Sequence, residues 1–254
     1  MHRAAYDRLG LDWSYDAYDV DERGLPGFVG GLDASWRGLS LTMPLKRAVL
    51  PLLDDVSAVA REVGAANTVI LDAGRLSGDN TDVPGIVAAL AERGVTRVRA
   101  ATILGGGATA ESVLLALRRL GLDSVVVQVR EPARAEHLVG RAVSAGLDVV
   151  VGRLGDDDPP AADVVVSTVP AAAVEAVEAA AERLVSRSEV VFDAVYDPWP
   201  TPLVERAADL GRAVVTGIDL LAHQAVLQVE IMTGHDVPVD VLRNRALVAL
   251  GSGT

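Results

Sequence analysis

The chain has 254 residues, a formal net charge of −12 and no cysteine. Such an acidic chain is a poor partner for nucleic acid, and the lack of cysteine excludes thiol catalysis, disulfides and Cys-ligated zinc and fits a reducing cytoplasm. The first residues have no apolar signal core, and no apolar run approaches membrane-spanning length. We therefore expect a cytoplasmic protein of one large or two medium domains that acts on small molecules, with neither nucleic acid nor membrane as a partner.

Lys46 is the only lysine among the 23 basic residues, and all the others are arginines. A guanidinium stays charged in a protein, whereas an ammonium is a compact donor that can exchange its proton. Lys46 also follows a polar segment that begins at Ser40. It is therefore a candidate catalytic group, and a lysine that merely remains on the surface is the alternative.

The first third of the chain predicts a small α/β unit. Asp54 and Asp55 open a segment with apolar residues at helical spacing, and Gly64 closes it. Residues 67–71 are typical of a strand, and a turn rich in glycine and aspartate follows through Asp82.

From about residue 97, apolar strands alternate with helical segments. Gly121 and Gly211 stand where helix C-caps are expected, and Thr201 precedes a proline as an N-cap would. The expected strands are 100–104, 124–129, 148–151, 163–167, 189–193 and 213–216, and residues 219–250 are helical again. This alternation, with strands apolar on both faces, predicts an α/β fold with a parallel doubly wound sheet.

A glycine-rich motif of the form G-x-G-x-x-A lies between the strand 100–104 and a helical segment. In this context the glycines allow a tight turn, and the helix N-terminus can face a pyrophosphate. The motif therefore indicates a dinucleotide cofactor, although a turn of small residues without a ligand is the alternative. The candidate cofactor residues here are Gly105, Gly106, Gly107, Ala108 and Thr109.

Arg130 and Arg134 follow the next strand and favour NADP over NAD. A strict NAD site places an acidic residue at this strand end, where it accepts from the ribose hydroxyls, whereas two arginines can clamp a 2′-phosphate. Glu131 lies between them, and its carboxylate could instead bind the free ribose hydroxyl of NAD, so NAD stays an alternative cofactor.

Three polar islands stand out from the apolar background: residues 40–46, 64–68 and 78–82. Two of the three asparagines of the chain, Asn67 and Asn80, lie in these islands. Amides, hydroxyls, an ammonium and a carboxylate together can pair every hydroxyl of a polyhydroxylated small molecule. The islands therefore predict a site for such a substrate.

The islands, read in order, resemble the shikimate dehydrogenase family. Its patterns N-V-T-x-P-x-K, G-A-x-N-T and G-D-N-T-D match residues 40–46, 64–68 and 78–82, and V-Y-x-P-x-x-T-P-L resembles residues 195–203. The stretch 217–225 is similar to the family's G-x-x-M-L-x-x-Q-A. These matches span residues 38 to 225 and follow the order of the family. Together they are highly specific, although no single match would be.

The resemblance implies a role for each matching residue. It makes Lys46 and Asp82 catalytic, the lysine giving or taking the proton of the reacting oxygen and Asp82 holding it. It implies substrate contacts from Thr42, Asn67, Asp82, Tyr196 and Gln224, and adds Gly217 to the cofactor contacts Gly105 to Thr109, Arg130 and Arg134. No metal is implied.

The family also implies a two-domain α/β architecture and a reaction. Residues 1–82 and 218–254 are expected to form a discontinuous substrate-binding domain, and residues 83–217 an NADP-binding Rossmann-like domain. The reaction is the reversible NADPH-dependent reduction of 3-dehydroshikimate in aromatic amino-acid biosynthesis. The sequence is compatible with a monomer and with a homodimer.

The chain departs from the family pattern at its start. Met1 to Tyr6 resemble the interior of the family's first helix. In the family this helix follows a first strand and an S-x-S-P loop that holds the substrate carboxylate, and the sequence as given contains neither. We expect that the true start lies upstream of Met1. Two alternatives stay open: a dinucleotide-binding protein with little or no turnover, and a quinate/shikimate dehydrogenase that uses NAD. Ser40 and Leu220 replace the family's usual Asn and Met, which both positions should tolerate.

Overall fold

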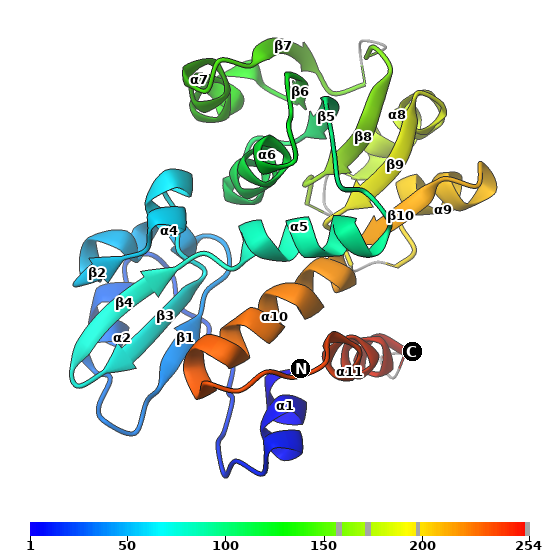
Figure 1. Ribbon diagram of the computed structural model, residues 1–254. Helices are drawn as coiled ribbons and strands as arrows, with labels where there is room; N and C mark the ends of the chain where they lie inside the picture. Colours follow the sequence, from blue (N-terminus) through cyan, green and yellow to red (C-terminus); the bar gives the residue numbers. More distant parts are fainter. Residues whose placement is uncertain (156–158, 171–173, 197–198, 252–254) are drawn as a thin grey trace. The chain divides into compact units, whose positions relative to one another are not determined.

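The computed structural model describes residues 1–155, 159–170, 174–196 and 199–251 (Figure 1). The chain divides into two compact units, one made of Met1–Gly85 with Leu221–Thr254 and the other of Ile86–Leu220. The first unit is therefore built from two separate stretches of the chain. The assignment of substrate to one part of the chain and cofactor to the other stays a prediction.

The first unit contains a four-stranded sheet in the order β1-β3-β4-β2. Strand β3 pairs antiparallel with β1 and with β4, and the short strand β2 runs parallel to β4. Thr68, the first residue of β3, lies opposite both Ser40 and Asp79. This register brings the polar residues at these strand ends together. The strands are β1 (Gly38–Ser40), β2 (Asp55–Val56), β3 (Thr68–Asp72) and β4 (Arg75–Asp79).

Two sequence predictions in this sheet were wrong. The helix expected from Asp54 begins only at Ala58, because Ser57 caps it by accepting from the backbone N–H of Ala60, and Asp55–Val56 instead pair with β4. The turn expected through Asp82 contains strand β4. Gly78 made this segment look like a turn, and the Leu53 side chain packs against the space that a Cβ at Gly78 would fill.

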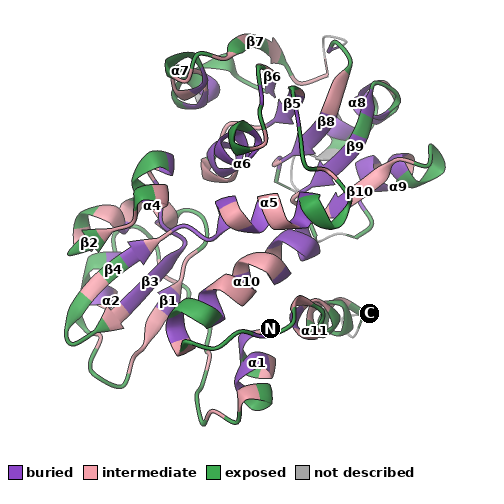
Figure 2. Cartoon of the chain, viewed as in Figure 1, coloured by how far each residue is buried: buried purple, intermediate pink, exposed green. Residues whose placement is uncertain are grey.

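Helices α2 and α3 pack on this sheet, whereas α1 and α11 pack against each other. Apolar side chains of α2, α3 and the sheet form one core with Leu25, Leu45 and Val69, and β3 is the most buried strand of the sheet (Figure 2). The helices are α1 (His2–Leu9), α2 (Leu25–Gly30), α3 (Leu45–Ala48), the 3-10 helix η1 (Leu50–Leu52), α4 (Ala58–Val63) and α11 (Val239–Gly251).

Two long helices, α5 (Asp82–Glu92) and α10 (Gly217–Thr233), each contain residues of both units. The sequence predicted one helical stretch over 219–250. The structure breaks it into α10 and α11, with Gly234 in the left-handed region at φ 74°. No helix in the described ranges is both long enough and apolar enough to cross a bilayer.

The second unit is built on a six-stranded sheet in the order β10-β9-β8-β5-β6-β7, with every neighbouring pair parallel. The predicted parallel doubly wound sheet is confirmed. The strand order reverses at β5, whose neighbours are β8 and β6, and ligands of such sheets bind at the carboxyl ends of the strands around this point.

The elements of the second unit follow the predicted alternation closely. The strands are β5 (Ala100–Leu104), β6 (Ser124–Val129), β7 (Asp148–Arg153), β8 (Ala162–Ser167), β9 (Ser188–Asp193) and β10 (Ala213–Thr216). The helices between them are α6 (Ala108–Arg119), the 3-10 helix η2 (Pro132–Ala135), α7 (Glu136–Ser144), α8 (Val174–Ser186) and α9 (Pro202–Asp209). Thr201 caps α9 by accepting from the Val204 N–H, and Gly121 and Gly211 have positive φ at helix ends, as predicted.

Candidate active site

Lys46 and Asp82 form a close ion pair in the first unit. Lys46 lies in the first turn of α3 and Asp82 opens α5, and the distance from Nζ to Oδ2 is 2.7 Å. The lysine side chain is 15% exposed and the aspartate 5%. Because little water screens it, this pair interacts more strongly than a surface pair, and each charge depends on the other.

Asn67 holds the second oxygen of Asp82. Its Nδ2 donates to Asp82 Oδ1 at 2.8 Å and also lies 3.0 Å from both Thr81 Oγ1 and Gln224 Oε1. An amide nitrogen has two protons, so these three acceptors share two hydrogen bonds. The amide oxygen accepts from the backbone N–H of Thr81 at 2.9 Å. Asn67 thus fixes Asp82 from one side while Lys46 holds it from the other.

Asn80 has a structural role, although it belongs to the same polar island as Asp82. Its side-chain oxygen accepts from the backbone N–H groups of Asp82 and Val83, and its nitrogen donates to the Ala65 carbonyl. These bonds cap the start of α5 and tie it to the preceding loop. The cap fixes the backbone from which the Asp82 side chain projects.

Gln224 and Thr42 differ in their surroundings. Gln224 lies on α10 in the first unit, where the carbonyl of its side chain accepts from Asn67 at 3.0 Å. Thr42 is exposed, and its backbone carbonyl accepts from the Leu45 N–H at 2.8 Å at the start of α3. The structure therefore brings Asn67, Asp82 and Gln224 into one cluster with Lys46, and places the Thr42 backbone at the base of the helix that carries the lysine.

The sequence prediction missed Gln228, which lies one helical turn after Gln224. It is 1% exposed and donates from Nε2 to Thr68 Oγ1 at 3.0 Å. The signal was present in the sequence, since residues four apart on a helix share a face and Gln224 had already been chosen.

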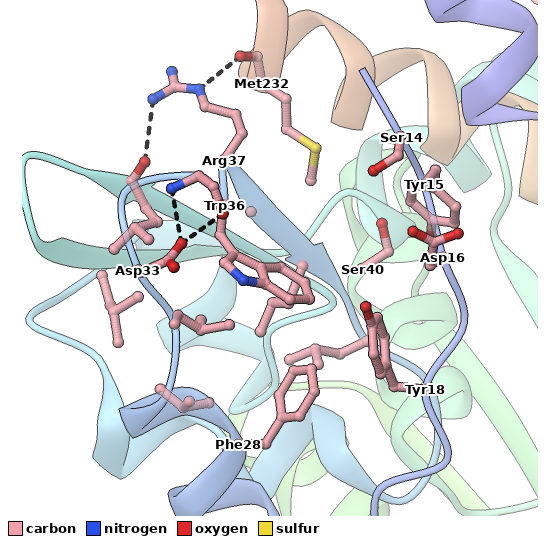
Figure 3. A pocket seen from close by; sticks show the side chains of 18 of the residues that line it. Ser14, Tyr15, Asp16, Tyr18, Phe28, Asp33, Trp36, Arg37, Ser40 and Met232 are labelled. Atoms are coloured by element: carbon pink, nitrogen blue, oxygen red, sulfur yellow. Dashed lines mark hydrogen bonds between the residues drawn. The ribbon is translucent and has the colours of Figure 1, made fainter. Parts of the chain in front are cut away.

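A cavity of about 1230 Å³ lies beside β1 in the first unit (Figure 3). Tyr18, Phe28 and Trp36 gather on one wall, and their ring centroids lie 5.2 to 5.7 Å apart. Ser40 and Thr42 line the cavity, whereas Lys46 and Asp82 are absent from its lining. This cavity therefore adjoins the polar cluster without containing its charged pair.

The glycine-rich loop of the second unit joins β5 to α6. Gly105 has φ 104°, and a Cβ there would lie 2.5 Å from Thr168 Oγ1, so this position requires glycine. Gly107 is the N-cap of α6, and within the described ranges no side chain caps this helix end. Its first backbone N–H groups are therefore available to an anion, which suits a pyrophosphate.

The other predicted cofactor residues lie at the same edge of the second sheet. Arg130 is exposed directly after β6, the neighbour of β5, and Glu131 is the N-cap of η2. Gly217 follows β10, where a Cβ would collide with the backbone oxygen of Ala194. The side chain of Arg134 lies outside the described part of the structure.

Tyr196 lies three residues after β9 in the second unit and is 42% exposed. The preceding Asp193 is 1% exposed, and it accepts from the Thr201 hydroxyl at 2.7 Å and from the Val195 N–H at 3.1 Å. Burial raises the pKa of Asp193, which these hydrogen bonds partly offset. The two bonds anchor the chain on either side of Tyr196.

Among the described residues, no group of three or more histidine, aspartate or glutamate side chains is arranged to hold a metal ion. The chemistry that the first unit offers is therefore that of an ammonium, a carboxylate and two amides. Such a set can bind hydroxyls and move one proton.

Comparison with known proteins places both ends of the chain in one family. Residues 1–69 match the model of the shikimate dehydrogenase substrate binding domain, and residues 217–247 match that of the shikimate 5′-dehydrogenase C-terminal domain. A curated NADP(+) shikimate dehydrogenase of Moorella thermoacetica is 35% identical over 100% of this chain and 89% of its own.

Solved structures of the same family have the same fold. The shikimate dehydrogenase of Mycobacterium tuberculosis is 36% identical, with a TM-score of 0.84 over 98% of this chain and 93% of its own. The Thermus thermophilus enzyme, solved in complex with NADP(H) and shikimate, is 34% identical with a TM-score of 0.84 over the same shares of the two chains.

Proposed function

Because this chain belongs to the shikimate dehydrogenase family, we propose that it catalyses the reversible NADPH-dependent reduction of 3-dehydroshikimate to shikimate in aromatic amino-acid biosynthesis. The observation that carries the proposal is the largely buried ion pair of Lys46 and Asp82, with Asn67 on the second carboxylate oxygen. We place the reaction in the cytoplasm. A chain without cysteine forms no disulfides, so its folding does not depend on an oxidising compartment.

Lys46 donates the proton in the direction of reduction. Negative charge grows on the ketone oxygen as the carbon is reduced, and a nearby ammonium stabilises that charge before delivering a proton. One N–H of Lys46 points to Asp82 Oδ2, which leaves two for the substrate. In the direction of oxidation the same nitrogen takes the alcohol proton.

Asp82 orients Lys46 and binds a substrate hydroxyl. Each of its oxygens accepts one internal hydrogen bond, from Asn67 at 2.8 Å and from Lys46 at 2.7 Å, and each has a further lone pair. The same proposal assigns substrate contacts to Thr42, Asn67, Gln224 and Tyr196. Asn67 and Gln224 already share a hydrogen bond, so they can bind adjacent hydroxyls.

The second unit offers a fitting site for NADP. The backbone at Gly105 and the uncapped start of α6 suit the pyrophosphate, Arg130 suits the 2′-phosphate, and Gly217 permits close approach after β10. We assign Gly105, Gly106, Gly107, Ala108, Thr109, Arg130, Arg134 and Gly217 to this site. When bound, the reduced cofactor supplies the hydride.

Two variants of Lys46 test the proton role. We expect Lys46→Ala to abolish turnover while NADPH still binds. We expect Lys46→Arg to be nearly as inactive, because a guanidinium keeps the charge but does not give up a proton at neutral pH. The measurement is the change in nicotinamide absorbance with shikimate and NADP, alongside NADPH binding by fluorescence. A rate for Lys46→Ala within tenfold of wild type contradicts the role.

A second candidate is a quinate/shikimate dehydrogenase that uses NAD. The observation in its favour is Glu131, a carboxylate next to Arg130 at the end of β6, where it can accept from ribose hydroxyls. Rates with NAD and NADP, each with shikimate and quinate, decide between the two. A higher kcat/KM with NAD and quinate supports the second candidate, and one with NADP and shikimate the first.

A further inference from the structure

We propose that Gln228, a residue with no direct place in the reaction, is a positioning residue that sets the orientation of Asn67 and through it holds Asp82 ready for Lys46. The inference rests on the proposed function for its kinetic consequence. Its structural part stands on the hydrogen bonds of the first unit alone.

The orientation of the Gln228 amide is determined by its partners. Nε2 lies 3.3 Å from the backbone oxygen of Asn67, and this oxygen can only accept, so the nitrogen must face it. The same nitrogen donates to Thr68 Oγ1 at 3.0 Å. The amide oxygen accepts from Ser40 Oγ at 3.0 Å. At 1% exposure Gln228 has little access to water as an alternative partner.

Gln228 directs the hydroxyl proton of Thr68. Because Gln228 donates to Thr68 Oγ1, the hydroxyl gives its own proton to another acceptor, and Asn67 Oδ1 lies 2.8 Å away. The alternative acceptor, Thr81 Oγ1, is 3.5 Å away and therefore weaker. Thr68 is fully buried, so its hydroxyl has no competing water.

Asn67 is thereby locked with its nitrogen toward Asp82. Its oxygen receives the Thr68 hydroxyl and the Thr81 N–H, at 2.8 and 2.9 Å, which leaves Nδ2 for Asp82 Oδ1. A flipped amide would set its oxygen against the carboxylate and its nitrogen against a backbone donor. The hydrogen bonds therefore run in one direction from Ser40 through Gln228, Thr68 and Asn67 to Asp82, which shares its other oxygen with Lys46.

The decisive variant is Gln228→Met, which keeps the length of the side chain but removes its hydrogen bonds. Thr233→Val is the matched control, because it removes a hydrogen bond from the same helix, to the Val229 carbonyl, outside this network. We expect kcat to fall about tenfold in Gln228→Met, with the KM for NADPH unchanged, as for a misplaced catalytic group. Ser40→Ala, which removes the outer hydrogen bond to Gln228, provides a milder second variant with a smaller fall in kcat.

The single lysine of the chain permits a readout without turnover. Labelling with 15N-lysine gives one side-chain Nζ resonance, which reports on the contact between Lys46 and Asp82. We expect this resonance to move in Gln228→Met and Ser40→Ala and to stay in place in Thr233→Val. If the wild-type protein shows no turnover, the proposed function is refuted. The Nζ resonance would still test whether Gln228 sets the contact between Lys46 and Asp82.

A double variant separates positioning from general loosening of the fold. If Gln228 acts through Asn67, then Gln228→Met costs no further activity in an Asn67→Ala background. The inference is overturned if folded Gln228→Met keeps both the Nζ resonance and the kcat of the wild-type protein. Independent losses that simply multiply in the double variant do so as well.

Discussion

Replacing Asp82 by asparagine should harm this site more than the similar shapes of the two side chains imply. Both oxygens of Asp82 face donors, with Asn67 Nδ2 at 2.8 Å from Oδ1 and Lys46 Nζ at 2.7 Å from Oδ2. An asparagine has one acceptor and one donor end. Whichever way the new amide turns, its NH2 group meets another donor, and the partly buried Lys46 ammonium loses its counter-charge.

The size of the effect follows from these two losses. A charge-assisted hydrogen bond contributes about 1.5–3 kcal/mol, and a buried unsatisfied donor costs about 1–3 kcal/mol. Taking about 3–4 kcal/mol for the pair, kcat/KM for shikimate should fall roughly 10²- to 10³-fold. The affinity for NADPH should change little, since the proposed cofactor residues belong to other segments of the chain.

The assay is steady-state shikimate oxidation followed by nicotinamide absorbance, with NADPH affinity measured by fluorescence. Asp72→Asn is the matched control, because it removes the same charge from the hairpin of β3 and β4 at a side chain that is 84% exposed. The reasoning is refuted if Asp82→Asn stays within tenfold of wild type. It is refuted equally if Asp72→Asn loses as much activity.

Three further predictions concern the cofactor loop, the 2′-phosphate and the dependence of stability on pH. Gly105→Ala should weaken NADPH binding at least tenfold by calorimetry, because its Cβ would lie 2.5 Å from Thr168 Oγ1 at a positive φ; unchanged affinity would exclude a close backbone approach there. Arg130→Ala should raise the KM for NADPH about tenfold and leave that for NADH unchanged, and an equal rise for both would argue against a phosphate contact. Burial lowers the pKa of His2 from 6.5 to about 4, so the folded state binds fewer protons and stability falls as pH drops from 6.5 to 4. Between these two pH values the free energy of unfolding should fall by about 3 kcal/mol. His2→Phe, which retains the stacking on Tyr15, should remove this part of the pH dependence when stability is measured by denaturation at each pH.

The sequence predicted the fold of the second unit well because each strand there is a continuous apolar run between helical segments. The first unit was harder to predict, since its sheet contains strands of two to five residues and one of them includes Gly78. Such short strands are defined by their pairing partners and by close packing, which local composition does not reveal.

The site was predictable where a residue was rare or belonged to a matched motif. Lys46 stood out as the single lysine, and Asn67 and Asp82 lay in polar islands. The role of Asn80 as a cap of α5 was not readable, because a capping asparagine and a ligand-binding asparagine look alike until their partners are known. Gln228 could have been found from its position one helical turn after Gln224, but its role could not, because its partner Thr68 lies 160 residues earlier in the chain.

The most direct test of the central claim is turnover of shikimate and NADP by the wild-type chain beside Lys46→Ala, followed by nicotinamide absorbance. The account predicts that the wild-type protein reduces NADP in the presence of shikimate and that Lys46→Ala binds NADPH but produces no signal. Equal rates for the two proteins, or a wild-type chain that binds NADPH and leaves shikimate unchanged, would contradict it.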